Sequence, residues 1–326
     1  MKKATKAAAG IAVICAAMGV GLYSFISNNK KEESSEVVSE VVTEAPTEPE
    51  TEPYTDILPK NWAEMYSYSP SDGGISEKSW EWLRRNKDYI GWLRIDGTFV
   101  DYPVMMDPGE TEAGDPLYGP EAHVPNSFYL DHNWDRSFYR DGAIYMDCKD
   151  TFDGCEKQQS ENLVIYGHNM ANGAMFGTIR RYRQDTDFYY DSAFVELSNL
   201  YKQYGYVVFS FFVTPGSYNA TDFVYWNMEE LDTKEEFDAY VKHCKDNSQL
   251  DTGIDVQYGD QLLTLSTCYA DYDNSRFIVV ARRMREGEVY GDISTIQCTK
   301  EYLKKHPNGL EKPKPEKDEE KDETAE

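Results

Sequence analysis

Residues 262–283, LLTLSTCYADYDNSRFIVVARR, constrain the fold of this chain more than any other stretch. Two runs rich in β-branched and apolar residues flank a polar loop of Asp, Asn and Ser, which is the pattern of two strands joined by a turn. Cys268 closes the first predicted strand, and Arg276 opens the second. A thiol at the exposed end of a rigid strand can attack a substrate, and a guanidinium across the turn can face the negative charge that develops. The stretch therefore predicts a pair of strands that carries a candidate nucleophile.

Acyl transfer also needs a group that carries a proton, and the best candidate lies upstream. In residues 162–169, NLVIYGHN, a short apolar run ends in Tyr166-Gly167-His168. An imidazole is suited to protonate a leaving amine and then to deprotonate an incoming one. A histidine after a strand is more often structural, but Gly-His-Asn in a loop is an awkward place for a core histidine. The sequence offers no obvious aspartate to orient His168, which favours a Cys-His pair with an arginine over a papain-like triad.

These motifs resemble the sortases, and more narrowly class B. The segments YGHNMANGAMFG (166–177) and TLSTC (264–268) are followed by Arg276 at the head of RFIVVARR, which is the class B order of His, Cys and Arg. The resemblance covers roughly residues 86–285. It implies a mostly β fold, a single sortase-like mixed β-barrel of seven to eight strands with an N-terminal helix and inserted helices. It also implies that His168, Cys268 and Arg276 are the catalytic residues.

The resemblance extends to a groove for a substrate peptide. In class B sortases, positions that match an Asn-x-x-x-Leu and, more weakly, a Thr-x-x-x-Tyr motif of this chain line that groove. Core packing is the alternative for Leu130 and Tyr225. Tyr269 sits where class B members vary, so it leaves the peptide preference open. The predicted substrate-binding residues are Asn126, Leu130, Tyr166, Thr221, Tyr225, Ser266 and Thr267.

The activity that the resemblance implies is that of a cysteine transpeptidase with thiol-protease chemistry, in the wall-anchoring system of a Gram-positive cell. A C-terminal sorting signal of the NPxTx or [SNP]PxTG kind would dock, and Cys268 would attack the carbonyl of its threonine. A peptidoglycan amino group, from a precursor or a cross-bridge, would then resolve the thioester. The implied chemistry needs no cofactor and no metal.

Three alternatives stay open at this point. The first is a pilin-polymerising class B sortase, in which the resolving amine is a pilin lysine; motifs alone do not separate the two. The second is a secreted cysteine protease in which water resolves the thioester, although papain-like enzymes place Cys before His and this chain has the reverse order. The third is a tethered binding module without catalysis. The oligomeric state, the client proteins and the sorting motif are left open as well.

The organisation of the chain predicts a tethered domain. Residues 1–27 are expected to form a signal-anchor, because lysines at the start precede a run of about twenty uncharged residues, which at about 1.5 Å each just spans a core of about 30 Å. A cleaved signal peptide is the rival interpretation. Residues 28–60 are an acidic, disordered linker, 61–310 the catalytic domain and 311–326 a disordered charged tail. The expected location is the cell membrane, with one membrane pass and an extracellular catalytic domain.

Composition excludes some functions. The net charge is −25, and no stripe of Lys and Arg could neutralise phosphates, which argues against nucleic acid as a partner. Neither GxGxxG nor GxxxxGK occurs. An acidic surface favours a cationic partner or an amine nucleophile, although solubility is the plainer explanation.

Local patterns predict the remaining elements. A helix is expected at 76–86, with Ser76 as its N-cap, and a hairpin with an Asp96-Gly97 turn at 91–104. Helices are also expected at 174–183 and at 233–245, the last opening with a Thr233-x-x-Glu236 capping box. Further strands are expected at 143–147, 163–166, 206–213, 262–267 and 277–282.

The other cysteines have less specific interpretations. Cys148 and Cys155 flank an acidic loop and could form a disulfide on an oxidising exterior, with two free thiols at least as plausible. Cys244 is expected to pack inside. A metal site that combines His123 and His132 with that cysteine pair matches no zinc spacing.

Overall fold

The computed structural model describes residues 74–107, 109, 113, 124–216, 223–227 and 231–310. The predicted signal-anchor, linker and tail lie outside the described residues. Residues 61–73, at the start of the predicted catalytic domain, lie outside them as well, and so do His123 and Thr221. In the part of the chain that the structure describes, we find no helix with the length and apolar character needed to cross a membrane.

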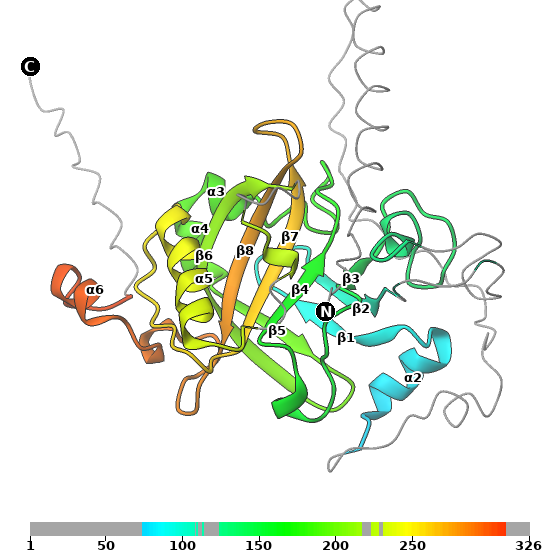
Figure 1. Ribbon diagram of the computed structural model, residues 1–326, viewed down its shortest axis with the longest axis horizontal. Helices are drawn as coiled ribbons and strands as arrows, with labels where there is room; N and C mark the ends of the chain where they lie inside the picture. Colours follow the sequence, from blue (N-terminus) through cyan, green and yellow to red (C-terminus); the bar gives the residue numbers. More distant parts are fainter. Residues whose placement is uncertain are drawn as a thin grey trace, which may run out of the picture.

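Eight strands close into one barrel in the order β1-β2-β3-β4-β7-β8-β6-β5, with β5 pairing back to β1 (Figure 1). The β2/β3 and β4/β7 pairs are parallel, and the other pairs are antiparallel. This confirms the expected single mixed β-barrel. The strands are β1 (Tyr89–Arg94), β2 (Asp101–Met106), β3 (Ile144–Met146), β4 (Asn162–Tyr166), β5 (Phe194–Ser198), β6 (Gln203–Pro215), β7 (Leu262–Tyr269) and β8 (Ser275–Arg283).

Two predicted helices are confirmed together with their caps. In α2 (Glu77–Arg85), the Ser76 side chain accepts a hydrogen bond from the Ser79 N–H at 3.1 Å. In α5 (Lys234–Asn247), Thr233 and Glu236 form the expected reciprocal capping box. Such caps satisfy N–H groups that a helix end leaves unpaired. The shorter helices are α3 (Arg181–Gln184), α4 (Thr186–Asp191) and α6 (Lys300–Lys305).

The predicted helix at 174–183 is wrong over most of its length, because the chain turns repeatedly and becomes helical only at Arg181. Met175 has a φ of 52°, which a right-handed helix does not allow, and it bridges to Asn169. A Cβ at Gly177 would lie 2.2 Å from the Met170 carbonyl oxygen, so the turn closes onto itself. Strand β5 and helix α4 were not predicted, because each is short and is fixed by its neighbours.

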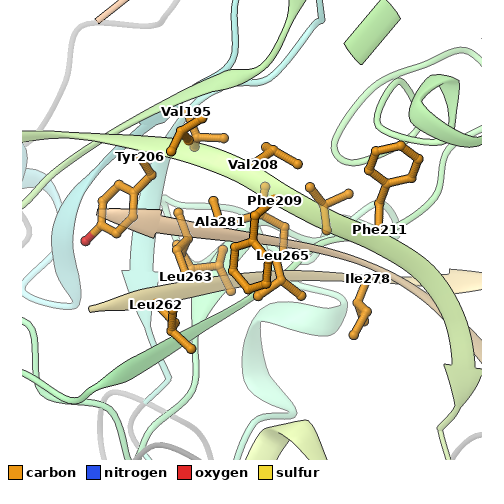
Figure 2. Close-up of a cluster of buried hydrophobic side chains, with 14 of the residues drawn as sticks. Val195, Tyr206, Val208, Phe209, Phe211, Leu262, Leu263, Leu265, Ile278 and Ala281 are labelled. Carbon is orange, nitrogen blue, oxygen red and sulfur yellow. The ribbon is translucent and has the colours of Figure 1, made fainter. Parts of the chain in front are cut away.

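The core lies where β5, β6, β7 and β8 face one another. Figure 2 shows Leu263 and Leu265 of β7 beside Phe209 of β6 and Ala281 of β8, and all four side chains are buried. Helix α5 covers the outer face of β6, so the strands here are apolar on both faces (Figure 1). A rigid, close-packed support therefore lies beneath β7, the strand that carries Cys268 near its end.

Candidate active site

The last turn of the barrel places Cys268 opposite Arg276. Strands β7 and β8 are antiparallel, and these two residues are directly paired in the register. Side chains that oppose each other in an antiparallel pair share one face, with Cα atoms about 4.5–5.5 Å apart. The first six residues of β7 are buried, whereas Cys268 is exposed. The thiol therefore stands at the solvent end of a rigid strand, and Arg276 lies directly across the β7–β8 pair from it.

Strand β4 runs parallel to β7 and brings His168 to the same end of the barrel. Their register ends at Tyr166 opposite Ser266, two residues before His168 and Cys268. The bonding continues beyond the strand, because the Gly167 N–H donates to the Ser266 carbonyl at 3.2 Å. The residues beside His168 are thus tied to the strand of the thiol.

Two side chains complete this connection. The Thr267 hydroxyl donates to the Gly167 carbonyl at 2.7 Å, and the Asn169 amide donates to the carbonyl of Cys268 at 3.0 Å. Gly167 has no room for a side chain, since an added Cβ would lie 2.5 Å from Ile144 Cδ1 and 2.9 Å from the Phe176 ring. The close approach of the chain at this point requires glycine.

The His168 ring is oriented by a backbone carbonyl. Its Nε2 atom lies 2.6 Å from the carbonyl oxygen of Leu130, at the end of the 3-10 helix Phe128–Leu130. Because a carbonyl only accepts, Nε2 must carry the proton, and in the neutral ring Nδ1 is then the basic nitrogen. This geometry assigns the tautomer and leaves Nδ1 for proton exchange with a reacting group.

Buried hydroxyl groups lie beneath the three residues. The Tyr225 hydroxyl and the Ser266 Oγ are hydrogen-bonded at 2.6 Å. Burial raises the pKa of Tyr225 to about 12, although the Ser266 hydrogen bond and the charge of Arg276 act in the opposite direction. Negative charge on Cys268 also raises the pKa of Tyr225, so the phenol interacts electrostatically with both candidate residues. With its raised pKa, Tyr225 stays neutral at physiological pH.

The predicted groove residues occupy different environments. Tyr225, Ser266 and Thr267 are buried. Tyr166 is half-buried and donates to a carboxylate oxygen of Asp147 at 2.7 Å. Together they form the layer under Cys268 and His168, and Tyr225 has the buried position that the core-packing alternative requires.

Asn126 and Leu130 belong to the segment that orients His168. Asn126 adopts a φ of 61°, and its side-chain oxygen accepts the Cys148 N–H at 2.9 Å. Asp107, which the sequence analysis did not select, is buried and accepts the N–H groups of Asn126 at 2.9 Å and Phe128 at 3.1 Å. This carboxylate fixes the start of the 3-10 helix whose last carbonyl holds His168. No motif pointed to Asp107, since its partners lie about twenty residues away in the chain.

The other cysteines that the structure describes are free thiols, so the disulfide that the sequence left open is not formed between Cys148 and Cys155. Burial raises the pKa of Cys148 to about 12. Cys244 is buried, as expected. Within the residues that the structure describes, no group of three or more His, Cys, Asp or Glu side chains could hold a metal ion.

Comparisons with known proteins match the domain that contains this site. A family model described as Sortase domain matches residues 150–284. Sortase B of Listeria monocytogenes is 29% identical over 210 residues, which are 64% of this chain and 74% of that protein. Sortase B of Staphylococcus aureus is 28% identical over 201 residues, which are 60% of this chain and 70% of that protein.

Solved structures agree with these matches. The X-ray structure of Clostridium perfringens sortase B is 28% identical, with a TM-score of 0.50, and the match covers 64% of this chain and all of that one. A Bacillus anthracis protein described as similar to sortase B is 25% identical, with a TM-score of 0.51, and the match covers 66% and 86% of the two chains.

Proposed function

We propose that the chain is a class B sortase, a cysteine transpeptidase that cleaves a C-terminal sorting signal after threonine and joins the surface protein to a peptidoglycan amino group. One observation carries the proposal: exposed Cys268 lies opposite Arg276 in the β7–β8 register, and its backbone carbonyl accepts a hydrogen bond from Asn169 of the His168 loop. This arrangement supports a site in which Cys268 is the nucleophile, His168 carries the proton and Arg276 stabilises the anion.

In the first half of the reaction, the Cys268 thiolate attacks the threonine carbonyl. The carbonyl oxygen gains negative charge, which the guanidinium of Arg276 stabilises with its fork of N–H donors. Nδ1 of His168 holds the proton that the Cys268 thiol lost when it became a thiolate. As the tetrahedral intermediate collapses, the peptide C–N bond breaks, and His168 gives this proton to the leaving amine. The product is a thioester between Cys268 and the surface protein, together with the released C-terminal fragment.

In the second half, the acceptor amine attacks the thioester carbonyl. His168 takes the proton that the amine loses, Arg276 again stabilises the oxyanion, and the Cys268 thiolate leaves. The new amide bond replaces the thioester, and the starting protonation state returns. No cofactor enters either half, and no metal is proposed.

The peptide would lie across the layer of Tyr166, Tyr225, Ser266 and Thr267, with Asn126 and Leu130 along the groove. Thr221, outside the described residues, stays a predicted groove residue. Two sortase B structures that share the fold are described as a substrate complex of the Staphylococcus aureus enzyme and as a complex with triglycine, at 23% and 24% identity. At that distance they show the fold alone, so the peptide and amine partners of this chain remain part of the proposal.

We place the catalytic domain outside the cell on a single membrane pass formed by residues 1–27, with residues 28–60 as its linker and 311–326 as a charged tail. The lysines that precede the apolar run support an inside N-terminus. The resulting position puts the domain where both a secreted protein and a wall precursor can reach it.

The test uses the purified full-length chain with fluorogenic peptides that carry NPQTN, SPKTG, PPKTG or LPxTG, with and without a peptidoglycan-type amine. Cys268→Ala is the key variant, and Cys155→Ala is its matched control, because Cys155 is also exposed. We expect cleavage after threonine that needs Cys268, and a product that changes from acid to amide when amine is added.

Other outcomes contradict the proposal in different ways. An acid product that persists at high amine concentration would indicate a protease. If every peptide survives while Cys268 still reacts with an alkylating reagent, a pilin lysine becomes the better acceptor to test. If the peptides survive and Cys268 does not react with the alkylating reagent either, the non-catalytic binding module becomes the better interpretation.

A further inference from the structure

Two arginines on one short segment contact both loops of the active site. Arg180 is the N-cap residue of α3, and Arg183 follows three positions later. Residues three apart at a helical turn lie on the same side of it. Helix α3 lies at the same end of the barrel as the β7–β8 loop (Figure 1). We call Arg180 and Arg183 the arginine pair.

Arg180 holds the loop that begins with His168. Its guanidinium donates to the carbonyl groups of Met170 at 3.3 Å and Ala171 at 3.1 Å, and to the side-chain oxygen of Asn169 at 3.3 Å. The amide nitrogen of Asn169 donates in turn to the Cys268 carbonyl. A continuous chain of hydrogen bonds therefore runs from Arg180 through Asn169 to the backbone of Cys268.

Arg183 holds the loop that follows Cys268. It forms an ion pair and hydrogen bond with Asp271, three residues after the thiol, and its guanidinium lies 5.0 Å from the ring centroid of Tyr269. The other end of that loop is fixed independently, because the Gly216 N–H donates to the Asn274 carbonyl at 2.7 Å.

We propose that the arginine pair is a positioning device that sets the distance and orientation between the His168 loop and the Cys268 loop. Its kinetic consequence rests on the function proposed above, whereas its geometric consequence does not. Partly exposed ion pairs such as Arg183–Asp271 add little to stability, so loss of this ion pair should have a limited effect on folding. Reaction rates, in contrast, fall about a hundredfold for a displacement of about 1 Å.

Arg181 provides a matched control, since it lies between the two arginines in sequence but contacts other groups. It donates to the Gly97 carbonyl at 3.3 Å, pairs with Asp185 at 3.8 Å and lies over the Phe188 ring. None of these contacts reaches the two loops. Arg181→Gln therefore changes charge and helix propensity as the other variants do, without touching the proposed device.

The kinetic experiment compares Arg180→Gln, Arg183→Gln and Arg181→Gln in the full chain. We expect kcat to fall about 10- to 100-fold in the first two, with KM and Tm close to those of the parent chain, and no change in the control. Asp271→Asn combined with Arg183→Gln should lose no more than either single variant, because both remove the same contact. Unchanged kcat in both arginine variants, or an equal loss in Arg181→Gln, would overturn the proposal.

A second experiment works even if the parent chain cleaves none of the peptides. Iodoacetamide labelling of Cys268 is followed by mass spectrometry across a pH series, with exposed Cys155 as an internal control. We expect Arg180→Gln and Asn169→Ala to change the rate and pH profile at Cys268 several-fold, with Cys155 unaffected. Profiles at Cys268 that match the parent chain in both variants would reject the positioning role, whatever the fate of the transpeptidase proposal.

Discussion

The Nε2 atom of His168 lies 2.6 Å from the carbonyl oxygen of Leu130, which joins the loop after β4 to a 3-10 helix 38 residues earlier in the chain. A carboxylate often orients the histidine of an active site, whereas a neutral carbonyl orients the ring of His168, the proposed proton carrier. A carbonyl fixes the tautomer without adding a negative charge beside the imidazole. The buried Asp107 acts one step further away, because it holds the start of that 3-10 helix.

The first prediction concerns this tautomer. In ¹⁵N-labelled protein above the titration range of the ring, Nε2 of His168 should show the chemical shift of a protonated nitrogen and Nδ1 that of an unprotonated one. Exposed His306 should show the mixture typical of a free imidazole. A protonated Nδ1 in neutral His168 would mean that the Leu130 contact does not orient the ring.

The second prediction concerns Arg276. Arg276→Lys keeps the charge but loses the planar fork of donors, so kcat for peptide cleavage should fall about 10²- to 10³-fold. Arg140→Lys serves as the control, since its side chain is 88% exposed and should leave kcat unchanged. Full activity in Arg276→Lys would show that a point charge is enough at this position.

The third prediction concerns thiol labelling of the native chain. Within residues 74–310, alkylation at pH 8 should modify the exposed Cys155 and Cys268 first. Cys148 should react slowly, because burial raises its pKa to about 12 and leaves little thiolate. Burial also raises the pKa of Cys244, which should react only on unfolding. Quantitative mass spectrometry of labelled peptides gives the order, and early modification of Cys244 would contradict the packing.

The fourth prediction concerns the barrel core. Leu263→Ala removes a fully buried side chain and should lower the free energy of unfolding by about 2–5 kcal/mol. Leu303 is 40% exposed on α6, and Leu303→Ala should cost less than about 1 kcal/mol. Urea denaturation measures both, and equal effects would show that the site of Leu263 collapses around the smaller side chain.

The fifth prediction concerns the buried ion pair between Arg282 and Glu288, whose side chains are 0% and 3% exposed. Burial alone would raise the pKa of Glu288, but hydrogen bonds from Arg282 and from the Arg285 N–H outweigh it, and the pKa is lowered. The stabilisation that ionised Glu288 provides is therefore complete above its unfolded-state pKa of about 4.5. It is lost as the pH falls through the lower folded-state pKa.

Glu288→Gln should cost about 3–5 kcal/mol at pH 7, because it leaves Arg282 buried without its counter-charge. The difference from the parent chain should shrink below about pH 4.5. Asp246→Asn, in the exposed pair with Lys242, should cost about 0.5 kcal/mol or less. Urea denaturation from pH 7 to pH 3 measures how the stability difference between Glu288→Gln and the parent chain depends on pH. A difference that does not change with pH would contradict an ionic origin of the stabilisation.

Much of this protein could be predicted from local pattern. The capped helices begin where Ser76 and Thr233 predict, because capping depends on residues within one turn. The strand that carries Cys268 follows from its run of β-branched and apolar residues, and the turn at Asp96-Gly97 follows from the positive φ that glycine allows. The sequence by itself also predicted that His168, Cys268 and Arg276 form one constellation, since each lies in a short motif that resembles the class B sortases.

Contacts between distant segments were decided only by the tertiary structure. The barrel brings Leu130 to His168, Asp271 to Arg183 and Asn169 to the backbone of Cys268, at sequence separations of 38, 88 and 99 residues. The turns in residues 174–180 replaced a predicted helix for the same reason, because Met175 is held by a bridge to Asn169. Helix caps and strand alternation are properties of neighbouring residues. The orientation of an imidazole depends on which carbonyl the closed barrel places beside it, and the sequence around His168 carries no record of that partner.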